Sequence, residues 1–256
     1  MPAVLAVFAH PDDIEFRAAG TLLRLRAAGW DLHYCNLSTG DLGSTRMTAK
    51  QTAITRAGEA QAAAKLLGAT WHPSLGDDLQ IFYSDKNLRR ICALIREVEP
   101  LAILTHPPLD YMEDHMVTCR LTVTAAFGRG IPNYRSVPRR NPSLTPVTLY
   151  HSAPHGLCGP LREPWRPEFY VDTTRVHAQK LAALSCHRSQ QEWLDASQGM
   201  NSYLAAATAD SVEIGRRSRN FRKAEGFTRH LHLGFAGPES DPLRDVLGEG
   251  YRRARR

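Results

Sequence analysis

Short apolar runs alternate with amphipathic stretches along the first half of the chain. Continuous runs rich in Val, Ile, Leu and Phe predict buried strands, and apolar positions spaced three and four apart predict helices. The expected strands cover 4–9, 31–39, 71–79 (a short strand with its loop) and 101–105, and the expected helices cover 16–28, 48–67 and 84–98. This alternation predicts an α/β fold with a Rossmann-like, doubly wound, mostly parallel sheet flanked by helices.

The second half of the chain has a more broken pattern. Prolines and arginines dominate 133–146, which fits a linker, a flap over a pocket or an oligomer contact. The further elements expected here are strands at 147–151 and 168–173, a helix at 176–189 and a helix from Asn201. The stretch 235–251 has Gly and Pro punctuation and resembles an arm. Arms of this kind often mediate assembly, so it favours a homo-oligomer.

Length and composition set limits on this picture. With 256 residues and 43% apolar composition, we expect a single α/β domain over 1–256, with a catalytic half at about 1–130 and a decorated C-terminal half at about 131–256. No apolar run reaches the ~18 residues of a membrane span and no leader precedes the first strand, so we expect a cytoplasmic protein without a membrane span. Five cysteines without Cys-x-x-Cys spacing fit free thiols in a reducing compartment.

The formal net charge of +6 changes this picture little. Four of the positive charges belong to the tail arginines Arg252, Arg253, Arg255 and Arg256. Such a tail is usually a solvated chain end, and no basic stripe interleaved with aromatic residues is visible. We therefore expect a small-molecule partner and no nucleic acid.

The first apolar run breaks abruptly into His10, Pro11, Asp12 and Asp13. Ligands of open α/β sheets bind at the carboxyl ends of such strands, and the proline forces a turn there. His10 and Asp13 could then point to one spot, with Asp12 left over, as in a metal-dependent hydrolase. The same residues could instead form a helix cap and an acidic first turn, so this segment alone leaves both interpretations open.

A second set of candidate ligands follows the strand expected at 101–105. His106, two prolines and the segment from Asp110 to His115 come directly after it. We expect Asp114 to cap the next helix, which places His115 in its first turn. If this strand lies beside the first one, His115 faces His10 and Asp13. Catalytic zinc sites use three such N and O ligands and keep the fourth position for water.

Ala-His-Pro-Asp-Asp at 9–13 and the pair Asp114-His115 resemble the two motifs of the PIG-L/LmbE-like family of zinc-dependent N-acetylglucosaminyl deacetylases. The resemblance implies that His10, Asp13 and His115 hold Zn²⁺ or another divalent metal. It also implies that Asp12 is the general base, taking a proton from a zinc-activated water and returning it to the leaving amine. The implied substrate is an N-acetylated amino sugar or glycoconjugate, hydrolysed at its amide bond.

The resemblance also assigns substrate contacts. It implies such contacts for Arg56, Asp78 and the Gly-rich loop at 39–44, where Asp41 would contact substrate or support the site. Arg56 with Glu59 could instead be a surface pair at i, i+3. A Gly/Pro loop carries His155, which would be a stacking and specificity element if it faces the site.

Met112 departs from the family pattern. Many members have a His three residues before the metal-binding His, where it stabilises the oxyanion, and losing one such donor costs on the order of 2.7 to 4 kcal/mol. We expect His187 to replace it as a catalytic group, and His155 as the second choice; a lone helical His such as His187 could also be structural. Met112 also supports an alternative, a non-catalytic sugar-binding or assembly protein on the same fold. The retained Asp12 argues against that alternative, and a nucleotide-dependent Rossmann enzyme lacks its glycine fingerprint here.

Overall fold

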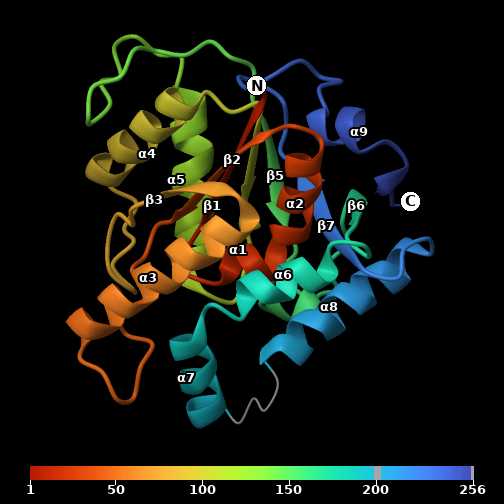
Figure 1. Ribbon diagram of the computed structural model, residues 1–256. Helices are drawn as coiled ribbons and strands as arrows, with labels where there is room; N and C mark the ends of the chain where they lie inside the picture. The colour runs from red at the N-terminus through yellow and green to blue at the C-terminus, as the bar shows by residue number, and fades with distance from the viewer. Residues whose placement is uncertain (199–202, 255–256) are drawn as a thin grey trace.

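The computed structural model describes residues 1–198 and 203–254, which form one eight-stranded sheet with helices on both faces (Figure 1). The strand order is β3-β2-β1-β4-β5-β7-β6-β8, and pairing is parallel from β3 to β5 and antiparallel from β5 to β8. The strands are β1 Ala3–Phe8, β2 Asp31–Asn36, β3 Ala69–His72, β4 Ala102–Thr105, β5 Thr148–Ser152, β6 Phe169–Asp172, β7 Ala224–Arg229 and β8 Tyr251–Arg253. The predicted fold class is confirmed.

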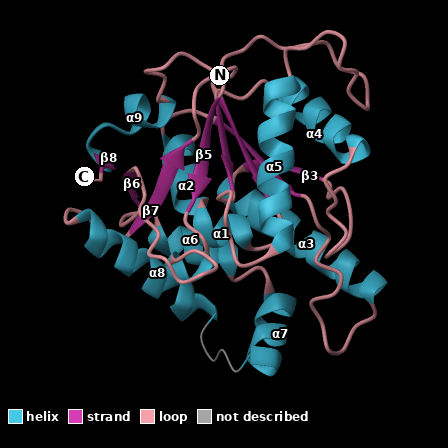
Figure 2. Ribbon diagram, turned by 180° about the vertical axis from the view of Figure 1, so that it is seen from behind, coloured by secondary structure: helices cyan, strands magenta, loops and turns pink. Residues whose placement is uncertain are grey.

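Helices cover both faces because the central strand is apolar on both sides. Val4, Ala6 and Phe8 pack in one core with α2, α3 and α6, while Leu5 and Val7 pack in another with α4 and α5 (Figures 1 and 2). The helices are α1 Asp13–Arg17, α2 Ala19–Ala27, α3 Ala49–Leu67, α4 Asp85–Val98, α5 Glu113–Gly128, α6 His177–Leu184, α7 Arg188–Gln198, α8 Tyr203–Ser218 and α9 Pro242–Leu247. Short 3₁₀ turns lie at His155–Leu157 and Gly248–Gly250. No helix in the described chain has the length and apolar character needed to cross a membrane.

Local capping signals explain where the long helices begin and end. Thr48 and Gln51 form a reciprocal capping box at the start of α3, and Gly68 ends this helix with a φ of 71°. The Ser84 side chain caps α4 by accepting from the backbone of Asn87. The helices predicted at 48–67 and 84–98 are therefore confirmed to within one residue at each end.

The helix predicted at 16–28 is two helices, so that prediction was partly wrong. The chain breaks at Ala18, which has a φ of −141°. The Glu225 carboxylate on β7 accepts hydrogen bonds of 2.8 Å from the backbone N–H groups of Gly20 and Thr21. A side chain more than two hundred residues away thus caps the start of α2, and no local signal could indicate this.

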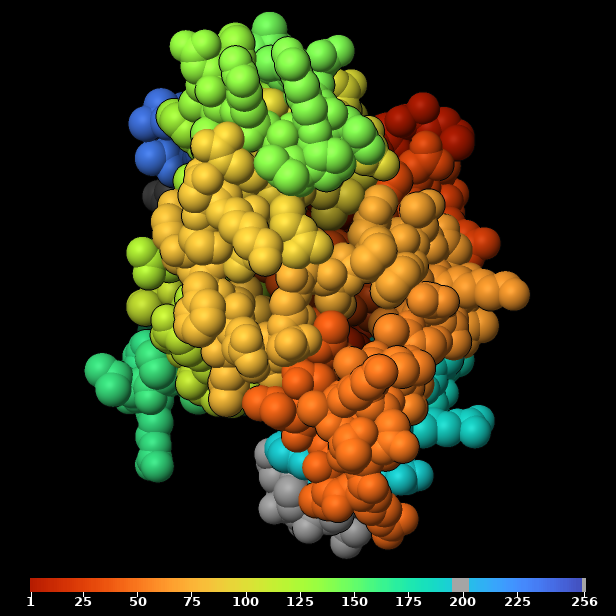
Figure 3. Space-filling view, turned by 90° about the vertical axis from the view of Figure 1, so that its left-hand side faces the viewer, coloured from red at the N-terminus to blue at the C-terminus, as the bar shows by residue number. Residues whose placement is uncertain are grey.

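The C-terminal elements also differ from the prediction. β7 was missed, and the expected arm at 235–251 forms α9 and leads into β8, with Leu243 and Leu247 in the same core as α2. The helix expected from Asn201 is seen from Tyr203, because Asn201 lies outside the described residues, as do Arg255 and Arg256. Residues 133–146, where regular structure was expected to stop, carry no helix or strand and lie over α4 at the top of Figure 3. Arg96 holds the chain just before this segment by donating to the backbone carbonyls of Arg129 and Ile131.

Candidate metal centre and active site

A cavity of about 640 Å³ opens at the carboxyl ends of the parallel strands, where open α/β sheets bind their ligands. Residues that follow β1, β2, β3, β4 and β5 line one part of it, and residues of α3, α7 and α8 line the rest. The polar residues on its wall are His10, Asp12, Asp13, Arg17, Arg56, Asp78, Tyr111, His115, His155, Gln190 and Asp210. The cavity is therefore rich in groups that titrate or bind ions.

The first motif turns sharply after β1. Asp12 has a φ of 111°, a backbone conformation that residues other than glycine rarely adopt and that costs of order 1–3 kcal/mol. Asp13 begins α1, and its Oδ2 atom accepts a 2.8 Å hydrogen bond from the backbone N–H of His10. This tight turn directs Asp13 back toward His10, and it places Asp12 on the cavity wall.

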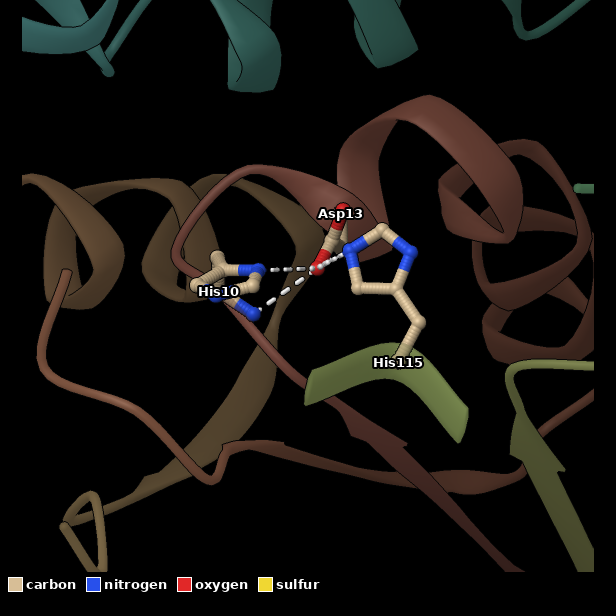
Figure 4. A group of neighbouring side chains, drawn as sticks. All are labelled: His10, Asp13 and His115. Atoms are coloured by element: carbon tan, nitrogen blue, oxygen red, sulfur yellow. Dashed lines mark hydrogen bonds and ion pairs between the residues drawn. The ribbon is translucent and has the colours of Figure 1, made fainter. Parts of the chain in front are cut away.

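The three predicted ligands lie together. Asp13 Oδ2 is 3.4 Å from His10 Nδ1 and 3.4 Å from His115 Nε2 (Figure 4). All three side chains are buried, and their ligand atoms lie within 4.8 Å of one another. Two imidazole nitrogens and one carboxylate oxygen are the donor set of a catalytic zinc site, so these residues fit a divalent metal ion.

Each histidine of this group has its other ring nitrogen on a carboxylate. His10 Nε2 lies 3.2 Å from Asp114 Oδ2, and His115 Nδ1 lies 3.1 Å from Asp110 Oδ1. Such carboxylates fix the tautomer and the ring orientation of metal-binding histidines. Asp114 was predicted to cap α5, and this was wrong: Met112 is the N-cap residue, and Asp114 lies in the first turn, facing His10 and the backbone N–H of Leu79.

Asp110 and His106, for which the sequence predicted no role, lie beside the candidate ligands. Together with His115 they form a second group of possible metal ligands. However, His106 Nε2 accepts a 2.9 Å hydrogen bond from the backbone N–H of Ala9, and His115 Nδ1 faces Asp110. The His106 ring stacks on His115 at a centroid distance of 3.9 Å. This second group therefore supports the first one, since His106 Nε2 and His115 Nδ1 each face a protein partner already.

Burial and neighbouring charges separate the two adjacent carboxylates. Burial, reinforced by the charge of Asp13, raises the pKa of Asp12 to about 6. Burial also acts to raise the pKa of Asp13, but His115 and His106 outweigh it and hold that pKa well below its usual range. Asp13 thus stays an anion, as a metal ligand must, while Asp12 can exchange a proton near neutral pH.

Asp12 has a partner that its sequence context did not indicate. The Tyr203 hydroxyl on α8 donates a 2.5 Å hydrogen bond to Asp12 Oδ2. Tyr203 is 191 residues away in the chain and almost fully buried. The bond fixes the carboxylate beside the metal-ligand group, and it leaves the second oxygen of Asp12 for a proton transfer.

The predicted substrate residues have different positions. Arg56 is buried, and it donates to the backbone carbonyls of Gly40 and Pro11, so it is no surface pair with Glu59. Arg56 and Asp78 both line the cavity. Asp41 is not among the described residues that line it; its Oδ1 atom accepts a 2.8 Å bond from the backbone N–H of Asp78 and supports that loop.

The two candidate replacements for the missing histidine are placed very differently. His187 is fully buried, 3.2 Å from Glu15, and is not among the described residues that line the cavity. Its position does not allow the predicted contact with substrate. His155 lines the cavity, as does Met112, and His155 Nε2 lies 3.3 Å from Asp13 Oδ1. The structure therefore reverses the predicted order and favours His155.

The fold and the site define an α/β class with a His-Asp-His group that could hold a metal ion at the carboxyl ends of the parallel strands. Comparisons with known proteins show which family the chain belongs to. The family model PIG-L, described as GlcNAc-PI de-N-acetylase, matches residues 5–126. A probable N-acetyl-α-D-glucosaminyl L-malate deacetylase 2 of Bacillus cereus is 30% identical over 198 residues, which cover 74% of this chain and 84% of that protein. The chain belongs to the PIG-L family.

Relatives within this family differ in the reaction that their names describe. A 4-oxalmesaconate hydratase of Pseudomonas putida is 29% identical over 197 residues, which cover 74% of each chain. The solved structure of N,N'-diacetylchitobiose deacetylase from Pyrococcus horikoshii has a TM-score of 0.74 at 22% identity, covering 94% of this chain and 88% of that one. That last similarity shows the shared fold.

Proposed function

We propose that the protein is a zinc-dependent hydrolase that removes an N-acetyl group from an amino sugar conjugate. The observation that carries the proposal is Asp12: it is a carboxylate on the cavity wall beside the His10, Asp13 and His115 group, and it is not needed as a ligand. Family membership supports the reaction class, because the Bacillus cereus relative is named a deacetylase. A pure binding protein would have no use for this additional carboxylate.

The chain's own residues can divide the chemical work. A metal ion held by His10, Asp13 and His115 would lower the pKa of water toward ~7 and polarise the acyl carbonyl. Asp12 takes the proton from the attacking water and later returns it to the leaving amine, a contribution of typically ~10²- to 10⁴-fold. The Tyr203 hydroxyl holds Asp12 in place during both transfers.

Other residues of the cavity would bind the substrate and its developing charge. His155 Nε2 faces the metal-ligand group, so it would donate a hydrogen bond to the oxyanion as the acyl carbon becomes tetrahedral. Asp78 and Arg56, which also line the cavity, would bind substrate hydroxyl groups. The backbone of Gly43 packs closely against the Arg56 side chain, because a Cβ at residue 43 would lie only 2.8 Å from Arg56 Nη1.

The testing experiment combines metal analysis with product detection. Protein purified without added metal is assayed for bound zinc, and free amine is measured with a panel of N-acetylglucosamine conjugates before and after chelation. We expect stoichiometric zinc and amine release that chelation stops and zinc restores. Bound zinc without amine release from any conjugate would contradict the deacetylase assignment, and failure to bind any divalent metal would contradict the ligand group.

A second candidate reaction is hydration of an unsaturated acid. Two observations favour it: the 29% identical relative is named a 4-oxalmesaconate hydratase, and Met112 occupies the place of a histidine that the deacetylase pattern carries. Incubation with 4-oxalmesaconate, followed by chromatography of the product, distinguishes the two reactions. Turnover of this acid without amine release in the first assay would establish hydration in place of deacetylation.

A further inference from the structure

A chain of three polar contacts ends at the metal-ligand group. Asp210 Oδ2 on α8 lies 2.9 Å from Nη1 of Arg17, and Nη2 of Arg17 lies 2.7 Å from His155 Nδ1. His155 Nε2 then lies 3.3 Å from Asp13 Oδ1. Arg17 is 3% exposed and belongs to α1, only five residues after the proposed base, yet nothing in the proposed reaction uses it.

The chemistry of these groups fixes the position of one proton. A guanidinium only donates hydrogen bonds, so the Nδ1 atom of His155 must be the acceptor of the 2.7 Å contact. A neutral imidazole that accepts at Nδ1 carries its hydrogen on Nε2. The ionised carboxylate of Asp13 only accepts, so the contact at the other ring nitrogen requires the same Nε2–H form.

We propose that Arg17 is a positioning residue that holds His155 in its Nε2–H tautomer with this N–H directed at the reacting centre. Asp210 anchors the guanidinium from α8. His155 then acts as a hydrogen-bond donor to the oxyanion, and it serves neither as a proton-accepting base nor as a metal ligand through Nε2. The catalytic consequence rests on the proposed function, whereas the tautomer itself does not.

The shape of arginine suits this task and lysine does not. Two separate nitrogens of one planar guanidinium contact Asp210 and His155, which come from different elements. A lysine ammonium is a single point on a flexible stem, so it could not bridge the two partners in the same geometry. Arg17→Lys keeps the positive charge, but it should lose the Nε2–H tautomer of His155 as Arg17→Met does.

The first test measures the tautomer directly and needs no activity. Protein labelled with ¹⁵N-histidine is studied by long-range ¹H–¹⁵N correlation spectra, and His155→Gln identifies the signals of His155. We expect the Nε2–H pattern in the wild type and a shift toward Nδ1–H in Arg17→Met. A wild-type His155 in the Nδ1–H form, or a pattern that Arg17→Met leaves unchanged, would overturn the proposal.

The second test separates positioning from substrate binding. Arg17→Met should keep stoichiometric metal and lower kcat by about 10- to 100-fold, approaching the loss seen when an oxyanion donor is removed, while KM changes less than threefold. His155→Phe should cause a similar loss, and the double variant should lose no more than either single one. A raised KM with an unchanged kcat would instead show that Arg17 binds an anionic part of the substrate.

Two further variants keep the result interpretable. Arg120→Met removes a solvent-facing arginine of α5 that stacks over Tyr83, and it should leave the His155 spectrum and kcat unchanged. Asp210→Asn weakens the contact that anchors Arg17 but keeps Arg17 itself, so His155 should partly populate its Nδ1–H form. This variant tests the proposal if Arg17→Met does not fold. If the tautomer responds as expected while no conjugate is deacetylated, the positioning role stands and the proposed function fails.

Discussion

Asp12 and Asp13 are adjacent in the chain but lie in opposite electrostatic environments. Asp13 faces four histidines, His10, His106, His115 and His155, whereas Asp12 faces one hydroxyl, that of Tyr203. The left-handed backbone at Asp12 creates this division, because it sends two consecutive side chains to different partners. A single local distortion thereby makes one carboxylate a ligand and leaves the other free for proton transfer.

This division predicts what replacement of Asp12 does. Asp12→Asn keeps the shape of the side chain and an acceptor for Tyr203, so the metal group should stay intact. We expect stoichiometric metal and a rate of amine release lower by about 10²- to 10⁴-fold, the usual contribution of a general base. His115→Ala is the matched contrast and should lose the metal. A near-normal rate in Asp12→Asn would remove Asp12 from the mechanism.

Asp110 leads to a prediction about metal affinity. Its carboxylate is almost fully buried and contacts the ligand His115 at Nδ1, so it sets the direction in which Nε2 points. Asp110→Asn should weaken metal binding by about 10- to 100-fold while the fold is kept. Competition with a chelator of known affinity measures this change, and exposed Asp85→Asn on α4 serves as control. An unchanged affinity would show that Asp110 does not orient the ligand.

At the scale of elements, the break between α1 and α2 depends on a buried ion pair. Lys180 Nζ on α6 donates to Glu225 Oε1 at 2.8 Å and to the backbone carbonyl of Phe16 at 2.9 Å. The same glutamate accepts from the first N–H groups of α2. Four elements, α1, α2, α6 and β7, are thereby joined next to the segment that carries the proposed ligand Asp13.

Removing one partner of this pair should destabilise the whole protein. Lys180→Met leaves the Glu225 charge buried and the carbonyl of Phe16 unpaired, and breaking such a pair typically costs about 3–5 kcal/mol. Unfolding in guanidinium chloride measures the loss, with exposed Lys65→Met on α3 as control. A midpoint equal to that of the wild type would show that the pair contributes nothing to the free energy of unfolding.

The elements also show which parts of the structure the sequence could predict. Strand β1 and helices α3 and α4 were predicted because their signals are local: a continuous apolar run for the strand and apolar positions spaced three and four apart for the helices. The break at Ala18 was missed because its cause, Glu225, comes from another element. Strand β7 was missed because Glu225 and Gly226 interrupt its apolar pattern, although both are buried.

The residues of the candidate site also divide into those with a local sequence signal and those without one. His10, Asp12, Asp13 and His115 were identified because they lie in two short motifs, and the order of strands brings those motifs together. His106 and Asp110 lie shortly before the second motif, and only their contacts show that they support the candidate ligands. Arg17, Tyr203 and Asp210 make contacts across separations of up to 193 residues. His187 was expected in a helix, but it lies between α6 and α7, buried beside Glu15, a position that local spacing does not indicate.

At the scale of the whole molecule, the C-terminal segment completes the domain. The apolar residues of α9 fill the core beside α2, and β8 pairs with β6 at the edge of the sheet. Tyr251 stacks on Phe169 at a centroid distance of 4.4 Å, and Asp241 accepts hydrogen bonds from the Tyr150 and Tyr251 hydroxyls. The segment predicted as an assembly arm therefore buries apolar side chains within its own chain.

This packing predicts a stability effect without a change of assembly. Leu243 is fully buried, so Leu243→Ala should lower the free energy of unfolding by about 2–5 kcal/mol. Leu231→Ala removes a leucine that is 63% exposed, and it should stay within about 0.5 kcal/mol of the wild type. Light scattering after size exclusion should give the same mass for all three proteins, because Leu243 faces the interior of its own chain. Leu243→Ala could instead stay folded at unchanged stability but have a lower mass. That result would show that α9 forms an interface between copies and that its packing against α2 does not contribute to the stability of the fold.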